Sequence, residues 1–334
     1  MTMEKIINSW RIKKFKPIYW LEGEESFFID QLSSFAETSI LEKEEANFNL
    51  TIFYGKDTQW ADVINACRRY PMFSEKQVVI IKEAQQLREI EKLEPYFENP
   101  LLSTILIVCF KDKKLDGRTK FSKLVKEKGE LFSSKKLYDN QIPQWANEFV
   151  KSKGFEITNK ALMLLVEHIG NDLSRITNEI QKLVLNLGNR KTIDENDIET
   201  YIGISKEFNV FEFQNAVAAK NFTHCFKIIQ YFEQNSKSAP IQLILPTFYS
   251  FFSKLFMMYG LNSHDSKTVA TLIGVNPFFV NDYLQAIKKY SFREVEQAIL
   301  LLNHYNLRSV GVNGTATEDA SLLKEMIYKI VNYK

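Results

Sequence analysis

The turn after the first apolar segment is where this sequence would carry nucleotide chemistry. It reads LEGEESF from Leu21 to Phe27. A phosphate-binding loop needs glycines for a tight backbone cradle, a lysine for the phosphates and a hydroxyl for magnesium. Here Gly23 is alone, the lysine is absent, and the carboxylates of Glu22, Glu24 and Glu25 would repel phosphate. We expect this turn not to bind a nucleotide.

The second half of a nucleotide site is missing as well. An ATPase with a phosphate-binding loop also has a magnesium-binding aspartate at the end of a buried strand. The apolar segment Val78–Ile81 is followed by Lys82 instead, with Glu83 alone behind it. The sequence therefore predicts no ATP hydrolysis by this chain and no bound cofactor.

Four histidines and three cysteines are the remaining residues that could hold a metal or act as nucleophiles: His168, His224, His264, His304, Cys67, Cys109 and Cys225. They form neither an HExxH motif nor a paired zinc spacing, so we expect no metal site. The neighbours His224 and Cys225 would point to different sides of a helix. The three cysteines are scattered and odd in number, which favours a reducing compartment and a cytoplasmic location.

The first 140 residues alternate between strand-length and helical patterns. Apolar segments of strand length lie at Pro17–Leu21, Leu50–Tyr54, Val78–Ile81, Thr104–Phe110 and, more weakly, Leu131–Leu137. Between these segments apolar residues recur with helical spacing. The four groups are Phe27, Phe28, Leu32 and Phe35; Trp60, Val63, Ile64 and Cys67; the segment Ala84–Phe97; and Phe121, Leu124 and Val125. Repeated alternation predicts an α/β domain with a mostly parallel sheet covered by helices on both faces.

Strand signals vanish after Asn140, and the rest of the chain predicts helices. We expect Asp139 or Asn140, Thr158, Thr223, Ser291 and Thr317 to cap them. The 334 residues, 45% hydrophobic and 25% charged with a net charge of +2, suit a folded chain of two or three domains. We place the boundaries at residues 1–140, 141–206 and 207–334, the first α/β and the other two all-α.

One helical segment, Pro240–Leu261, is apolar enough to raise the question of a membrane span. Polar residues recur through it and Lys254 lies within it, which favours a buried or interface helix and no membrane. Its apolar residues cover more than one face, so we expect central packing with some apolar surface left for partner subunits.

The turn Tyr70-Pro71-Met72-Phe73-Ser74 is the most informative segment. Pro71 ends a helix, and the next strand starts a few residues later. Met72 and Phe73 therefore lie at the tip of a connection. They either fold back over the core or stand exposed as an anchor for a partner. The residues alone leave both possibilities open.

Five segments in order resemble the delta-subunit family of the bacterial DNA polymerase III clamp loader: PIYWLEGEESFFID (Pro17–Asp30), CRRYPMFSEKQVVIIKEA (Cys67–Ala84), GNDLSRITNEIQKLVL (Gly170–Leu185), FNVFEFQNA (Phe208–Ala216) and IGVNPFFV (Ile273–Val280). The resemblance covers essentially the whole chain. It implies an AAA+-like α/β domain that has lost its ATP site, a small helical lid bundle and a helical collar domain.

The resemblance also implies partners. In that family the turn matching Met72 and Phe73 presents a hydrophobic pair to the β sliding clamp and springs the ring open. We carry this role to Met72 and Phe73, with Pro71 and Tyr70 as shaping neighbours. The other implied partners are the gamma/tau and delta prime subunits and, through the assembled loader, primed DNA.

Two departures from the family pattern concern the contacts with other subunits. The helix Asn303–Gly311 has Asn306 and Val310 where the family usually shows an acidic residue and a lysine. The Ser-Arg-Cys motif of neighbouring loader subunits is absent, since Ser174-Arg175 is followed by Ile176. The first departure puts the collar contacts of that helix in doubt.

Charge is segregated within the first domain. Glu22–Glu45 holds eight acidic residues and one lysine, whereas Lys111–Lys136 holds ten basic and four acidic residues. Solvated helix faces explain such runs, and contact with DNA phosphates or an acidic partner is the alternative. The leading hypothesis is a clamp-binding interaction subunit. An ATP-hydrolysing AAA+ motor subunit and a nucleic-acid-binding adaptor are the alternatives.

Overall fold

The computed structural model describes residues 2–205, 208–235, 240–261, 265–275, 279–312 and 318–332. The chain forms two compact units, residues 1–137 and 138–334. The expectations for His264, for Thr317 as a helix cap and for part of the segment Ile273–Val280 lie outside the described residues.

The first unit is built on a five-stranded sheet. Its strands are β1 (Ile18–Gly23), β2 (Leu50–Tyr54), β3 (Gln77–Lys82), β4 (Thr104–Lys111) and β5 (Glu130–Ser134). They lie in the order β2-β3-β4-β1-β5, and every pairing is parallel. The parallel sheet that the sequence predicts is therefore confirmed.

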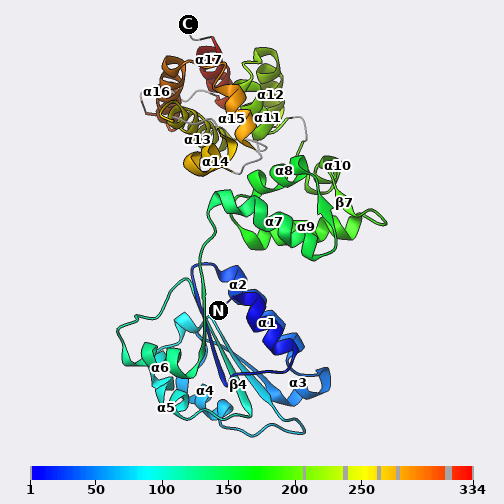
Figure 1. Ribbon diagram of the computed structural model, residues 1–334, viewed down its shortest axis with the longest axis vertical. Coiled ribbons are helices and arrows are strands. Elements are labelled where there is room, and N and C mark those ends of the chain that lie inside the picture. The colour runs from blue at the N-terminus through cyan, green and yellow to red at the C-terminus, as the bar shows by residue number, and fades with distance from the viewer. Residues whose placement is uncertain are drawn as a thin grey trace. The chain divides into compact units, whose positions relative to one another are not determined.

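Helices cover both faces of this sheet, which explains the continuous apolar runs in its central strands. One layer contains α1 (Met3–Arg11), α2 (Ser26–Ser39) and α3 (Lys43–Asn49), and the other contains α4 (Trp60–Cys67), α5 (Glu94–Glu98) and α6 (Lys120–Lys128) (Figure 1). Alternate strand residues enter the two cores: Tyr19 and Leu21 pack with the first layer, whereas Ile18 and Trp20 pack with the second.

The expectation of one helix from Ala84 to Phe97 is wrong. Two short 3₁₀ turns, η1 (Ala84–Gln86) and η2 (Ile90–Leu93), precede the short helix α5. Each 3₁₀ turn follows a residue in the left-handed region, Glu83 with φ of 52° and Glu89 with φ of 54°. A helix cannot continue through such residues, so the apolar spacing is met by three separate turns.

The second unit begins with a helical bundle that also holds two short strands. Its helices are α7 (Ile142–Ser152), α8 (Asn159–Ile169), α9 (Leu173–Asn186), α10 (Glu195–Asp197) and the π-helical turn η4 (Ile198–Ile202). Strands β6 (Glu156–Ile157) and β7 (Thr192–Ile193) pair in parallel, so the expectation that strands end at residue 140 is wrong. Two residues per strand are too few for a visible alternating pattern.

The helices that follow share one hydrophobic core, which runs from Phe213 to Val331. They are α11 (Val210–Ala218), α12 (Phe222–Gln234), α13 (Ile241–Tyr259), α14 (Ser266–Ile273), α15 (Val280–Ala286), α16 (Phe292–Ser309) and α17 (Asp319–Val331). The division of this unit at residue 206 stays a prediction.

The predicted helix caps are partly correct. Thr158 and Ser291 cap α8 and α16 as expected. The N-cap of α12 is Asn221 rather than Thr223, and α7 begins after Gln141 instead of at Asp139 or Asn140. Both errors follow from helix ends that the pattern fixes only to within a few residues.

Helix α13 is long and apolar enough to cross a membrane by length and composition. It contributes Phe248, Phe252 and Leu255 to the buried core of the C-terminal helices. Tyr249 and Met257 on the same helix are about half exposed, at 53% and 50%. The helix is thus packed centrally with one apolar face open, and contact of that face with partner subunits stays a prediction.

Candidate protein-interaction site

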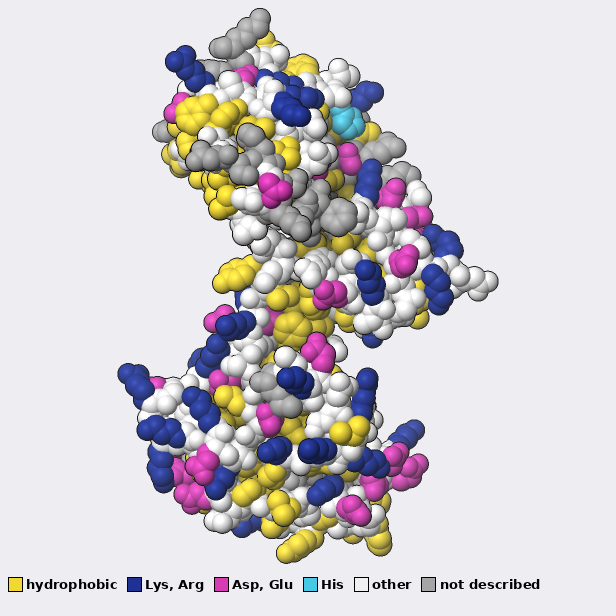
Figure 2. All heavy atoms as spheres, viewed as in Figure 1, with side chains coloured by type: hydrophobic (Ala, Val, Ile, Leu, Met, Phe, Trp, Pro, Cys, Tyr) yellow, Lys and Arg dark blue, Asp and Glu magenta, His cyan; other side chains and the backbone are white. Residues whose placement is uncertain are grey.

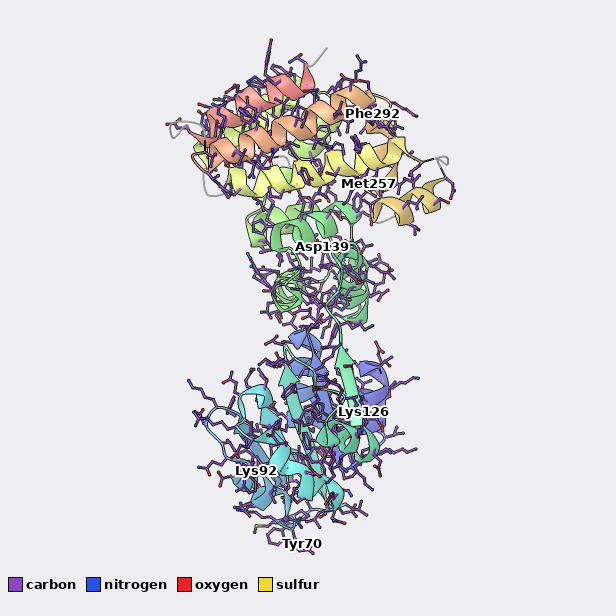
Figure 3. The ribbon with its side chains drawn as sticks, turned by 90° about the vertical axis from the view of Figure 1, so that its left-hand side faces the viewer. Tyr70, Lys92, Lys126, Asp139, Met257 and Phe292 are labelled. Atoms are coloured by element: carbon purple, nitrogen blue, oxygen red, sulfur yellow. The ribbon has the colours of Figure 1, made fainter. Side chains whose placement is uncertain are left out.

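The turn from Tyr70 to Ser74 lies at the amino edge of the sheet, where the parallel strands begin. Helix α4 ends at Cys67, and the chain passes through the turn before β3 starts at Gln77. The starts of β2 and β4, at Leu50 and Thr104, lie at the same edge because the strands are parallel. Figure 3 labels Tyr70 at the lower end of the first unit in that view.

The large apolar side chains of this turn are exposed. Tyr70 is 78% exposed, Met72 53% and Phe73 93%. The alternative in which Met72 and Phe73 fold back over the core is therefore wrong. Apolar side chains also gather at the lower end of the first unit in the view of Figure 2. Exposed apolar clusters of this kind are characteristic of interaction sites.

The backbone of the turn is held on one side by Asn49, the last residue of α3. Its Oδ1 accepts a hydrogen bond from the backbone N–H of Met72 at 2.7 Å, and its Nδ2 donates to the carbonyl oxygen of Met72 at 2.9 Å. The same Nδ2 donates to the carbonyl of Glu45 at 3.0 Å. Asn49 is buried, with 3% of its surface exposed.

Gln77 holds the other side of the turn. Its buried Nε2 lies within hydrogen-bond distance of the carbonyl oxygens of Arg69 (2.5 Å) and Ala66 (3.2 Å) and of Oγ1 of Thr104 (2.7 Å). Thr104 in turn donates to the carbonyl of Cys67 at 2.9 Å. The end of α4 is thus tied to the starts of two neighbouring strands.

Immediately after Met72, Phe73 has a left-handed backbone, with φ of 55°. A bulky residue rarely adopts this region, because it costs about 1–3 kcal/mol and the surrounding contacts must impose it. The turn therefore presents its most exposed aromatic ring in a fixed, disfavoured conformation. The sequence indicates Met72 and Phe73, but it gives no signal for Asn49, whose partner is 23 positions away.

The opposite, carboxyl edge of the sheet holds the turn that lacks a phosphate-binding sequence. The backbone N–H of Gly23 donates to the carbonyl of Lys113 at 3.1 Å, and that of Glu25 donates to Oγ of Ser134 at 3.2 Å. The buried carboxylate of Glu22 accepts from the N–H of Leu115 at 3.1 Å. Two backbone N–H groups of this turn, those of Gly23 and Glu25, are thus already bonded within the protein.

Two basic side chains at this edge, Lys82 and Lys111, are paired as well. Lys82 forms an ion pair with Glu37 at 2.9 Å, and Lys111 contacts both Asp30 and Glu83 at 2.7 Å. The hydrogen bond from Lys111 lowers the pKa of Glu83. Burial opposes the charge of Lys111, but its bonds to Asp30 and Glu83 outweigh that effect and raise its pKa. Lys82 and Lys111 are thus both held by carboxylates within the protein.

Metal-ligating side chains do not gather in the part of the chain that the structure describes. Among those residues no group of three or more His, Cys, Asp or Glu could hold a metal ion. Cys67, Cys109 and Cys225 are free and buried. Burial raises the pKa of Cys109 to about 12, so its thiol is a poor nucleophile at neutral pH.

Part of the basic segment Lys111–Lys136 is neutralised locally. Lys120, at the start of α6, pairs with Glu94 and, at 3.8 Å, with Glu98. Arg118 pairs with Asp116 at 2.9 Å. Lys126, labelled in Figure 3, belongs to the same helix. The segment is thus a mixed charged surface rather than a uniformly basic one.

The parallel α/β unit and the helical bundles that follow it in the sequence have the AAA+-like fold. The structure of the Bacillus subtilis DNA clamp loader delta protein has the same fold, with a TM-score of 0.54 and 22% identity over 99% of each chain. The family model for the delta subunit of DNA polymerase III matches residues 19–135.

Two curated relatives agree. DNA polymerase III subunit delta of Bacillus subtilis is 24% identical over 325 residues, which span 93% of this chain and 91% of that protein. The probable subunit delta of Aquifex aeolicus is 25% identical over 226 residues, or 64% of this chain and 62% of that protein. The family model, both relatives and the solved structure therefore point to the same likeness: this chain is similar to the delta subunit of DNA polymerase III.

Proposed function

We propose that this chain binds the β sliding clamp through Met72 and Phe73 and opens the ring for loading on primed DNA. Pro71 and Tyr70 shape the turn in this proposal. The observation that carries it is the 93% exposure of Phe73 on a turn that hydrogen bonds fix from both sides. A rigid, exposed aromatic anchor can enter a partner's pocket at a small cost in conformational entropy.

The remaining roles in this proposal follow from the similarity to the delta subunit. Residues 207–334 would join the gamma/tau and delta prime subunits, and the open aromatic face of α13 supports this. Contact with primed DNA would arise in the assembled loader, in the cytoplasm. The lysines of Lys111–Lys136 are candidates for that contact. Residues 1–140 would act as the clamp-binding domain, and residues 141–206 as the lid.

The test is the double variant Met72→Ala with Phe73→Ala. Each side chain is worth roughly 1.5–3 kcal/mol when it is transferred from water to an apolar pocket. Removing both should weaken clamp binding by about a hundredfold or more. Melting should stay nearly unchanged, because exposed truncations shift stability by less than about 0.5 kcal/mol. Equilibrium binding to purified clamp and a thermal melt provide the two measurements.

A matched control removes exposed apolar surface elsewhere. Leu185 and Tyr249 are 84% and 53% exposed and lie in the second unit. Leu185→Ala with Tyr249→Ala should leave clamp affinity unchanged. Full clamp affinity in the Met72 and Phe73 double variant would refute the anchor. An equal loss in the control variant would show that the assay reports general surface hydrophobicity.

A further inference from the structure

Asn49 satisfies both backbone polar groups of Met72 with one side chain. Its amide accepts from the N–H and donates to the carbonyl of that residue, at 2.7 and 2.9 Å. This is the pairing that a neighbouring strand would provide, although Met72 precedes β3 by several residues. A side chain that is 3% exposed therefore extends the sheet's hydrogen bonding into the turn.

The location of this contact matters because it is next to the strained residue. Met72 immediately precedes Phe73, whose φ of 55° must be imposed by its surroundings. Gln77 fixes Arg69 on the far side of the turn, at 2.5 Å. Without Asn49, the segment from Tyr70 to Ser74 would lose the anchor next to the aromatic ring, and Phe73 could relax to an ordinary conformation.

We propose that Asn49 is a positioning residue for partner binding: it holds Met72 and Phe73 in the conformation that the clamp recognises. This inference rests on the proposed clamp-binding function and adds a specific device to it. A turn that is already ordered loses less conformational entropy on binding. Asn49 itself need not touch the clamp, so its effect passes through the geometry of the turn.

The first experiment needs no partner. Chymotrypsin cannot cut after Tyr70, because Pro71 follows, but the bond between Phe73 and Ser74 is a potential site. In Asn49→Ala, cleavage of that bond in the native full-length chain should accelerate by about tenfold, because the local opening of the turn becomes easier. Global melting is measured on the same sample.

The second experiment measures clamp binding. Asn49→Ala should weaken the affinity by about tenfold although Met72 and Phe73 are intact, because the turn must now be ordered on binding. Asn49→Leu is the second variant, in case the alanine variant folds poorly. It keeps about the same volume but has neither the acceptor for the N–H of Met72 nor the donor to its carbonyl, so faster cleavage and weaker affinity are expected here too.

A matched control is Asn186→Ala. Asn186 in α9 donates to the carbonyl four residues earlier, as Asn49 does to Glu45, but holds no distant loop. It should leave cleavage at Phe73 and clamp affinity unchanged. Unchanged cleavage and unchanged affinity in folded Asn49 variants would overturn the inference, and so would faster cleavage with full affinity.

The two proposals fail in different ways. If the wild-type chain shows no clamp affinity, the proposed function falls, whereas the cleavage assay still decides whether Asn49 fixes the turn. If the Met72 and Phe73 double variant loses the clamp but folded Asn49 variants keep it, only the positioning role of Asn49 falls. Reduced affinity together with faster cleavage supports both.

Discussion

The two edges of the sheet in the first unit treat their functional groups in opposite ways. At the carboxyl edge, Lys82 and Lys111 are paired with carboxylates, and the N–H groups of Gly23 and Glu25 are bonded within the protein. At the amino edge, hydrogen bonds fix the backbone of the turn while the ring of Phe73 stays uncovered. The carboxyl edge thus pairs its polar groups within the protein, whereas the amino edge leaves apolar side chains exposed.

This contrast predicts whether the side chains of each edge contribute to folding stability or to binding. Polar groups that are paired within the protein stabilise the folded chain, and few of them remain unpaired to bind a ligand. An exposed apolar side chain on a fixed backbone adds little to folding and keeps its desolvation energy for binding. Substitutions at the carboxyl edge should therefore change stability, whereas substitutions at the amino edge should change association.

The largest effect on stability is expected from Gly23→Ala. Gly23 has φ of +133°, and an added Cβ would lie 2.2 Å from the carbonyl oxygen of Ser134. The positive φ disfavours any other residue, and the close carbonyl leaves no room for a side chain. We therefore expect the free energy of unfolding to fall by about 3 kcal/mol or more. The melting temperature should fall by roughly 10 °C. Fluorescence of the buried residues Trp10 and Trp20 reports this unit.

Gly117→Ala is the matched control, since the nearest heavy atom to its added Cβ is Nζ of Lys126 at 3.7 Å. It should melt close to the wild type, and so should Phe73→Ala at the opposite edge. If Gly23→Ala were equally harmless, the carboxyl-edge turn would be open enough to remodel around a ligand, and the contrast between the edges would be lost.

A smaller and pH-dependent effect is expected from Lys111→Met, which removes the ammonium group shared by Asp30 and Glu83. The pKa of Glu83 is lowered in the folded state. Its contribution is therefore present above its unfolded pKa of about 4.3 and is lost as the pH falls through the lower folded value. We expect a loss of about 1–2 kcal/mol at pH 7, discounted for partial exposure of both carboxylates.

Urea unfolding of Lys111→Met and wild type at pH 7 and at pH 3 measures this difference. The difference between the two proteins should shrink at pH 3, because the favourable contribution of the Glu83 carboxylate is lost as the pH falls toward its lowered pKa. Lys111→Arg, which keeps the charge, should retain more of the stability than Lys111→Met. A difference that is the same at both pH values would mean that Lys111 acts through its alkyl packing rather than its charge.

The sequence predicts the parallel sheet well because β3 and β4 are buried on both faces and read as unbroken apolar runs. It fails between Ala84 and Phe97, because the left-handed backbone of Glu89, which interrupts the segment, leaves no mark in the hydrophobic spacing. Because Pro71 ends the helix before them, the sequence places Met72 and Phe73 in a turn. It does not decide whether their side chains are buried or exposed. Asn49 could not be found, because a side chain bonding a backbone 23 residues away follows no local pattern.

The smallest expected effect is that of ATP on the melting temperature. A site with a dissociation constant of about 10 μM would stabilise the chain by about 2.7 kcal/mol at 1 mM ATP, which is a shift of several degrees. We expect none with Mg²⁺ present, because phosphate would have to displace the carbonyl of Lys113 from Gly23 against the charge of Glu24 and Glu25. The same titration on a P-loop ATPase confirms that the assay detects binding. A shift of several degrees in this chain would show that the carboxyl edge can exchange its internal bonds for phosphate, which would favour the motor-subunit alternative.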